Sequence, residues 1–206
     1  MKKNEIIEDI SIATIVLTQV PINNFFSINQ NIEIHRGQWA YPLIGALLGF
    51  FTFLLIFLFE NIGIPNQASI LISLSMGILL TGALHEDGFA DFFDSLGGKD
   101  YSTRQQILKD SRLGSFGVLA LIIVFMIKFL LLSGLEYPLA LACALISSSS
   151  LGRFSILLLV NYSDLSKQAG LTKHLKKVNN RTIILCGIFS CISVITVSNG
   201  RERSEI

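Results

Sequence analysis

The run WAYPLIGALLGFFTFLLIFLF, residues 39–59, decides the fold class of this chain. It contains no Asp, Glu, Lys, Arg or His. A helix needs about 20 consecutive apolar residues to cross the hydrocarbon core of a bilayer. We therefore expect residues 39–59 to cross a membrane as one helix.

Other apolar runs follow the same pattern along the chain. Three more are long enough to span a bilayer: Ile64–Leu84, Phe116–Leu132 and Pro138–Val160. The run Thr182–Ser198 is marginal in length, and Ile10–Ile22 better suits an interfacial or re-entrant helix. The sequence thus predicts an all-α, polytopic membrane bundle of about four or five transmembrane helices with an N-terminal interfacial helix.

The composition agrees with a chain whose solvent is largely lipid. Hydrophobic residues make up 51% of it, charged residues only 15%, and its mean hydropathy is +0.60. A net charge of +1 argues against a nucleic-acid-binding protein, which would carry a basic patch. The three cysteines lie inside apolar runs without CxxC spacing, which favours packing roles over a zinc site or a disulfide framework. We expect one membrane domain, residues 1–206.

The basic residues predict the orientation. The turns at residues 60–67 and 133–138 hold no Lys or Arg, whereas the connections on the opposite side hold nearly all of them. Connections rich in Lys and Arg stay in the cytoplasm. Residues 85–115 are therefore expected to form a cytoplasmic active-site segment.

Acidic residues gather at the start of that segment, in LTGALHEDGFADFFDSLGGKD, residues 80–100. If the helix continues past Gly88, Asp87, Asp91 and Asp94 share one face at i, i+4 and i+7. Three such carboxylates repel one another unless a cation lies between them, and their hard oxygens suit Mg²⁺, Mn²⁺ or Ca²⁺. The spacing is not that of an EF-hand loop, so we favour a metal shared with a substrate phosphate over a solvated acidic loop.

Basic side chains near the acids point to phosphate chemistry. Arg104 and Arg112 follow the acidic stretch and could bind phosphate oxygens, whereas Lys109 suits anchoring at the membrane. Asp110 could pair with Arg112 or join the metal shell. The nearby Gly114 and Gly117 would allow the backbone to approach a phosphate closely.

Two further residues have open interpretations. His85 could ligate the metal, bind an aspartate, act as a base, or simply lie at the membrane interface. Arg153 lies within an apolar run, where an arginine indicates an acidic partner or a phosphate, unless its side chain reaches the interface by snorkelling.

Five blocks of sequence carry a family resemblance: YPLIGALLG (41–49), TGALHEDGFADFFDSLGG (81–98), KDSRLGSFGVLAL (109–121), GRF (152–154) and AGL (169–171). Their order and spacing resemble the cobalamin synthase family, also called adenosylcobinamide-GDP ribazoletransferases. These are integral membrane enzymes of the last steps of cobamide assembly.

The resemblance implies a Mg²⁺-dependent transferase of the bacterial cytoplasmic (inner) membrane. Such an enzyme joins adenosylcobinamide-GDP to α-ribazole or α-ribazole 5′-phosphate and releases GMP. The implied metal ligands are Asp87, Asp91 and Asp94, with His85 or one aspartate as proton acceptor. The implied phosphate-binding residues are Arg104, Arg112 and Arg153. Membrane lipid and other cobamide-assembly enzymes are the expected partners, and no nucleic acid is expected.

The chain departs from the family pattern in two ways. Glu86 stands where an apolar residue is more usual, and the chain ends in SNGRERSEI where the family continues through further spans. The resemblance therefore implies an incomplete membrane domain, and a form lacking segments that complete the site would be inactive.

Two alternative functions remain. CDP-alcohol phosphotransferases carry a related aspartate-rich signature, but with an arginine that DGFAD (87–91) lacks. A divalent-cation transporter would place acids within its spans, and the four main apolar runs hold none.

Overall fold

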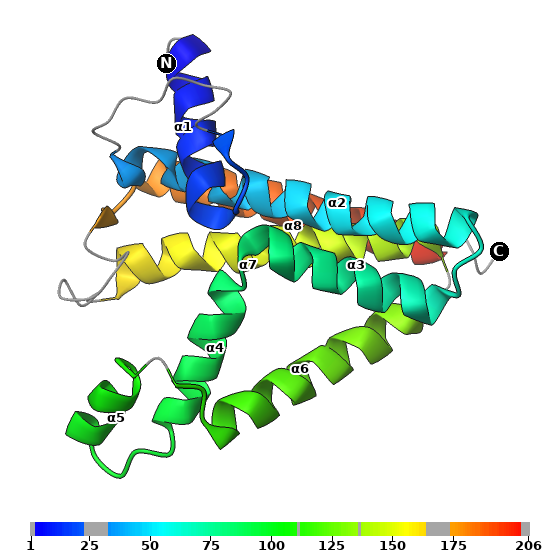
Figure 1. The fold of residues 1–206 in the computed structure, drawn as a ribbon. Helices are drawn as coiled ribbons and strands as arrows, with labels where there is room; N and C mark the ends of the chain where they lie inside the picture. The colour runs from blue at the N-terminus through cyan, green and yellow to red at the C-terminus, as the bar shows by residue number, and fades with distance from the viewer. Residues whose placement is uncertain (1–2, 23–32, 111, 136, 164–173, 203–206) are drawn as a thin grey trace.

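The computed structural model describes residues 3–22, 33–110, 112–135, 137–163 and 174–202, and the regular structure in them is helical throughout. The AGL block, residues 169–171, lies outside this part. The elements are α1 (Lys3–Leu17), η2 (Ile34–Ala40, a 3₁₀ helix), α2 (Tyr41–Asn61), α3 (Asn66–Thr81), α4 (Leu84–Ser95), α5 (Tyr101–Ile107), α6 (Ser115–Ser133), α7 (Pro138–Tyr162) and α8 (Asn180–Glu202). The all-α prediction is confirmed. Figure 1 shows α2, α3, α7 and α8 running lengthwise beside one another, while α4 and α6 diverge from them.

Three helical segments are long and apolar enough to cross a membrane: Ile34–Asn61, Ser115–Ser133 and Pro138–Tyr162. The pair formed by α3 and α4 counts as a fourth span only if both arms of a 90° bend are taken together. The apolar part of α8 that the structure describes, Asn180–Cys191, is shorter than a span. Three or four spans are therefore found in the described chain, against the four or five expected.

The bend between α3 and α4 corrects one predicted boundary. The run Ile64–Leu84 was expected to be one helix, but α3 ends at Thr81. Gly82 and Ala83 both take left-handed backbone conformations, with φ of 64° and 57°. Glycine adopts this conformation freely, whereas Ala83 adopts it at a steric cost. Hydropathy could not reveal the break, because both residues are small and uncharged.

Close packing of α2 on α7 forms the centre of the bundle. Gly45 and Gly49 are one helical turn apart on α2, and a Cβ atom at either would overlap the backbone of α7, at Ser149 and Leu145 respectively. Small residues at this spacing allow two membrane helices to approach closely. Helix α7 also packs on α8, where Ser150 Oγ donates a 3.0 Å hydrogen bond to Ser190 Oγ.

The N-terminal helix also differs from its prediction. The expected Ile10–Ile22 is wrong at both ends, because α1 runs from Lys3 to Leu17. Its polar part is held by tertiary contacts that the sequence pattern does not show. Asp9 is buried, pairs with Arg36 at 3.0 Å and accepts a 3.1 Å hydrogen bond from Trp39 Nε1.

Candidate active site

Helix α4 carries the acidic face. The expected continuation of the helix past Gly88 is confirmed, because α4 runs unbroken from Leu84 to Ser95. At 100° per residue, Asp87, Asp91 and Asp94 lie on one side of it. They differ in burial: Asp87 is exposed, Asp91 is partly buried and Asp94 is only 9% exposed. The three aspartates therefore have different environments.

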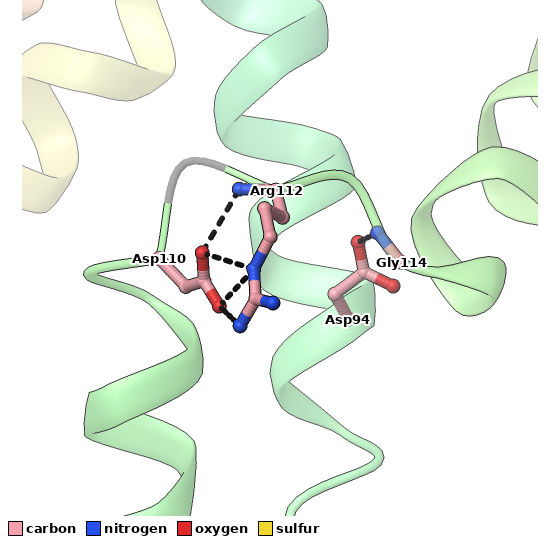
Figure 2. A network of polar contacts seen from close by, with 4 residues as sticks. All are labelled: Asp94, Asp110, Arg112 and Gly114. Carbon is pink, nitrogen blue, oxygen red and sulfur yellow. Dashed lines mark hydrogen bonds and ion pairs between the residues drawn. The ribbon is translucent and has the colours of Figure 1, made fainter.

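Asp94 is bound by the first turn of α6. Its Oδ2 accepts a 2.7 Å hydrogen bond from the N–H of Gly114, and its Oδ1 accepts a 2.8 Å hydrogen bond from the N–H of Gly117. Figure 2 shows the carboxylate of Asp94 directed at Gly114. A helix N-terminus has unpaired N–H groups and a partial positive charge, so a carboxylate there is doubly favoured. Asp94 thus caps α6 and joins it to α4.

The two glycines make this contact sterically feasible. A Cβ atom at Gly114 or Gly117 would overlap the Asp94 carboxylate. At Gly117 it would also lie 2.9 Å from the carbonyl oxygen of Ala90. The close backbone approach expected of these glycines is therefore made to a carboxylate of the chain itself.

The negative charges of Asp87 and Asp94 act on the carboxylate of Asp91, which lies between them on α4. Within the part of the chain that the structure describes, no three His, Cys, Asp or Glu side chains are grouped closely enough to hold a metal. Mg²⁺ commonly takes one or two protein carboxylates and completes its octahedron with water and substrate phosphates. Asp87 and Asp91 lie four residues apart on one face of α4, and their two carboxylates fit that kind of shared site.

The expected phosphate-binding arginines beside α5 both have partners in the chain. Arg112 lies in a bidentate ion pair with Asp110, 2.7 Å at its shortest (Figure 2). Of the two roles expected for Asp110, pairing with Arg112 or joining the metal shell, the structure therefore contains the pairing. Hydrogen bonds from Arg112 hold the pKa of Asp110 below its ordinary value. The Nε of Arg104 donates a 3.0 Å hydrogen bond to the carbonyl oxygen of Gly98. No contact that the structure describes joins either arginine to Asp87 or Asp91.

The start of α4 faces the intramembrane arginine. Electrostatic interactions couple Arg153 of α7 to Glu86, and His85 to both. The buried Nε2 of His85, Oε2 of Glu86 and Nε of Arg153 have no hydrogen-bond partner in the described chain. Glu86 is therefore an acidic residue whose charge acts on Arg153, although no ion pair within 4 Å joins the two in the described chain. The sequence alone did not predict that these two residues lie near each other. The signal that could have suggested it is Glu86 itself, an additional acid directly before Asp87.

Comparisons with known proteins give one family model and several relatives. A family model described as Cobalamin-5-phosphate synthase matches residues 9–201. The chain is 40% identical over 116 residues to a protein named adenosylcobinamide-GDP ribazoletransferase from Allorhizobium ampelinum, covering 56% of this chain and 45% of that protein. Proteins of the same name from Shewanella oneidensis and Shewanella baltica are 36% and 32% identical over 139 and 177 residues.

The matches to the Shewanella proteins cover 66% and 82% of this chain, and 52% and 66% of the relatives. The chain thus spans about half the length of the first curated relatives it matches. No solved structure matches it.

Proposed function

Because the family model matches residues 9–201, the chain belongs to the cobalamin-5-phosphate synthase family, and we propose that it transfers adenosylcobinamide phosphate from adenosylcobinamide-GDP to α-ribazole or α-ribazole 5′-phosphate, releasing GMP. The names of the relatives support this reaction. The observation that carries it is structural: Asp87 and Asp91 lie on one face of α4, and the charge of Glu86 in the first turn of α4 acts on the half-buried Arg153 of α7.

The proposed reaction is a phosphoryl-type displacement. A hydroxyl oxygen of ribazole attacks the phosphorus attached to cobinamide, and the bond from that phosphorus to the oxygen of GMP breaks. The leaving GMP takes the electron pair, and the hydroxyl proton passes to a base. His85 and Asp91 are the two candidates for this base, because they lie at the start and in the middle of the acidic helix.

The aspartates are proposed to hold Mg²⁺. Asp87 and Asp91 would bind the ion, which supplies charge neutralisation on the diphosphate when it is bound. Asp94, the third predicted ligand, fixes the acidic face against α6 through Gly114 and Gly117, and any contact to the metal would be made in addition to those hydrogen bonds.

Three arginines are proposed to bind phosphate oxygens. Arg153 is best placed, because its buried Nε lacks a partner in the described chain and His85 and Glu86 lie near it. Arg104 and Arg112 would bind the substrate from the α5 side. Arg112, which is 87% exposed, would exchange Asp110 for a phosphate.

The membrane location and the orientation of this site are also part of the proposal. Residues 85–115 would face the cytoplasm from the bacterial inner membrane, within a single membrane domain. The apolar helices support a multi-pass membrane protein. Enzymes that make adenosylcobinamide-GDP and α-ribazole are the proposed neighbours.

The test is Mg²⁺-dependent release of GMP from adenosylcobinamide-GDP by the full chain in lipid nanodiscs, with α-ribazole as acceptor. We expect Asp91→Asn to reduce the rate at least about 100-fold, a typical cost of losing a charge at a phosphoryl-transfer centre. The matched control is Glu60→Gln, because Glu60 is an exposed acid at the far end of α2.

Wild-type rates from Asp91→Asn would contradict the site assignment. Ion flux through the protein reconstituted in liposomes, without GMP release, would favour the transporter alternative. Turnover of a CDP-alcohol in place of adenosylcobinamide-GDP would favour the phospholipid enzyme.

A further inference from the structure

The segment that follows α1 contacts the bend from which the acidic helix starts, the elbow formed by Gly82 and Ala83. The backbone N–H of Gln19, just beyond α1, donates a 2.8 Å hydrogen bond to the carbonyl oxygen of Leu80 in the last turn of α3. The side chain of Gln19 lies against Gly82, where a Cβ atom would come within 2.9 Å of its Cγ and Cδ. Figure 1 shows the end of α1 next to the point where α4 leaves the bundle.

Gln19 completes the cap of α3. The last carbonyl groups of a helix have no partner within the helix. Those of Ile78 and Leu79 accept hydrogen bonds from the N–H groups of the elbow, at 3.0 and 3.1 Å. The carbonyl of Leu80 accepts its hydrogen bond from Gln19. The end of α3 is therefore closed in part by a residue that lies far from it in the sequence.

The elbow depends on support of this kind. Ala83 has a φ of 57°, a left-handed conformation that is sterically costly for a residue with a Cβ atom. Such conformations persist where the surrounding structure determines them. Helix α4 starts here without a side-chain cap and packs mainly on α6. Contacts from outside α3 and α4 therefore help to set the angle between the two helices, and Gln19 supplies one hydrogen bond and one packing contact.

Helix α1 is itself firmly held, so its end provides a fixed point. Asp9 pairs with Arg36 at 3.0 Å and accepts a 3.1 Å hydrogen bond from Trp39 Nε1. At the other end of α1, Leu17 is only 2% exposed and belongs to the buried cluster against which Leu80 packs. The contact of Gln19 with the elbow thus connects α3 to a helix that is anchored on the bundle.

We propose that Gln19 is a positioning residue for the active-site helix. It fixes the elbow, and through the elbow the angle at which α4 carries Asp87 and Asp91 away from the bundle. Its effect on turnover rests on the proposed transferase function, because these aspartates are the proposed Mg²⁺ ligands. Its effect on the angle of α4 is independent of turnover.

The contact can be disturbed from one side and relieved from the other. Gly82→Ala places a methyl group against the side chain of Gln19 and should displace the elbow. Adding Gln19→Ala removes the obstructing side chain and should restore the elbow in large part, although a left-handed φ at position 82 stays unfavourable for alanine. Gln19→Met keeps the length of the side chain and should resemble the wild type. Gln67→Ala is the matched control, because Gln67 is an exposed glutamine at the far end of α3.

The angle of α4 can be measured by pulsed electron paramagnetic resonance on the full chain in nanodiscs. Nitroxide labels are attached at Phe92→Cys on α4 and Tyr162→Cys at the end of α7, both exposed positions. In this background alanine replaces the three native cysteines, Cys143, Cys186 and Cys191. Phe92 lies about 14 Å along α4 from the elbow, so a change of about 15° in the angle moves it by roughly 4 Å.

We expect Gly82→Ala to shift or broaden the distance distribution by that amount, and the double variant to return toward the distribution of the unsubstituted background. In the unlabelled chain, Gly82→Ala should lower kcat for GMP release at saturating Mg²⁺ about tenfold, because small displacements of reacting groups are costly. The added Gln19→Ala should recover most of this loss. A substitution that only destabilised the fold would not be rescued by removing a second side chain.

Size-exclusion profiles and thermal transitions report the folding of each variant. An unchanged distribution in folded Gly82→Ala, or a double variant no closer to the wild type than Gly82→Ala, would overturn the proposal. If Gly82→Ala does not fold, Gln19→Ala replaces it in the comparison with Gln19→Met, and equal distributions for these two variants overturn the proposal as well. If the distances change as expected while even the wild type releases no GMP, the positioning role stands and the proposed reaction does not.

Discussion

The carboxylate of Asp94 and the backbone N–H of Gly117 are 23 residues apart in the chain and 2.8 Å apart in the structure. With the second hydrogen bond, from Gly114, this contact joins the end of the acidic helix to the start of α6. The position of Asp87 and Asp91 relative to the membrane helices therefore depends on Asp94. Asp94 was predicted to be a metal ligand, and the structure shows that its carboxylate holds α4 against α6.

Replacing Asp94 by asparagine should destabilise the chain. The variant keeps one acceptor oxygen but places an NH₂ group against a backbone N–H, in a site that is only 9% exposed. We expect a loss on the order of 2–3 kcal/mol, because hydrogen bonds to charged groups are the stronger class and the orphaned donor is buried. Thermal unfolding in detergent would measure it. Asp87→Asn is the comparison, because exposed Asp87 should change stability by less than about 0.5 kcal/mol.

Glycine 49 should tolerate no side chain at the crossing of α2 and α7. In Gly49→Ala, the added Cβ would lie 2.7 Å from Ile146 Cα and overlap the carbonyl of Leu145. We expect a loss of about 1–3 kcal/mol, the usual cost of overpacking. Gly152→Ala on α7 is the matched control, because a Cβ there meets nothing within 4 Å. Equal thermal transitions for the two variants would contradict the close crossing.

Helix α5 should depend on its N-cap. Asp100 accepts 2.7 Å hydrogen bonds from the N–H of Thr103 and the hydroxyl of Ser102, and these lower its pKa to about 2. Asp100→Ala should speed backbone hydrogen exchange over Tyr101–Ile107, while Asp100→Asn should keep most of the protection because asparagine also caps.

The same cap has a defined pH dependence. Since the folded-state pKa of Asp100 is lower than its unfolded value, the stabilisation is present above about pH 4 and is lost as the pH falls toward 2. The difference between the wild type and Asp100→Ala should therefore be constant between about pH 5 and 8. A difference that falls within that range would contradict the assignment.

Chelation should remove the proposed activity, and Mg²⁺ should restore it. We expect Asp87→Asn and Asp91→Asn to raise the Mg²⁺ concentration needed for half-maximal GMP release by roughly tenfold or more, because each removes a charged ligand from a site with few protein ligands. Glu60→Gln should leave the Mg²⁺ requirement unchanged. Identical Mg²⁺ titrations for all variants would exclude α4 as the metal-binding helix.

Local sequence features were sufficient for much of the fold. The uncharged run from Trp39 to Phe59 predicted α2, and the runs at 116–132 and 138–160 predicted α6 and α7, because lipid requires long apolar segments with internally satisfied backbones. The spacing of Asp87, Asp91 and Asp94 likewise indicated a shared helical face, since three positions on one helix are related by the helical repeat alone.

Only the tertiary structure decided which of these residues face one another. It bent the chain at Gly82 and Ala83, paired Asp94 with α6, and placed Glu86 within the electrostatic reach of Arg153. Each of these depends on contacts between helices. Hydropathy and helical spacing report on a single segment at a time, so they contain no information on the direction in which one helix leaves the next.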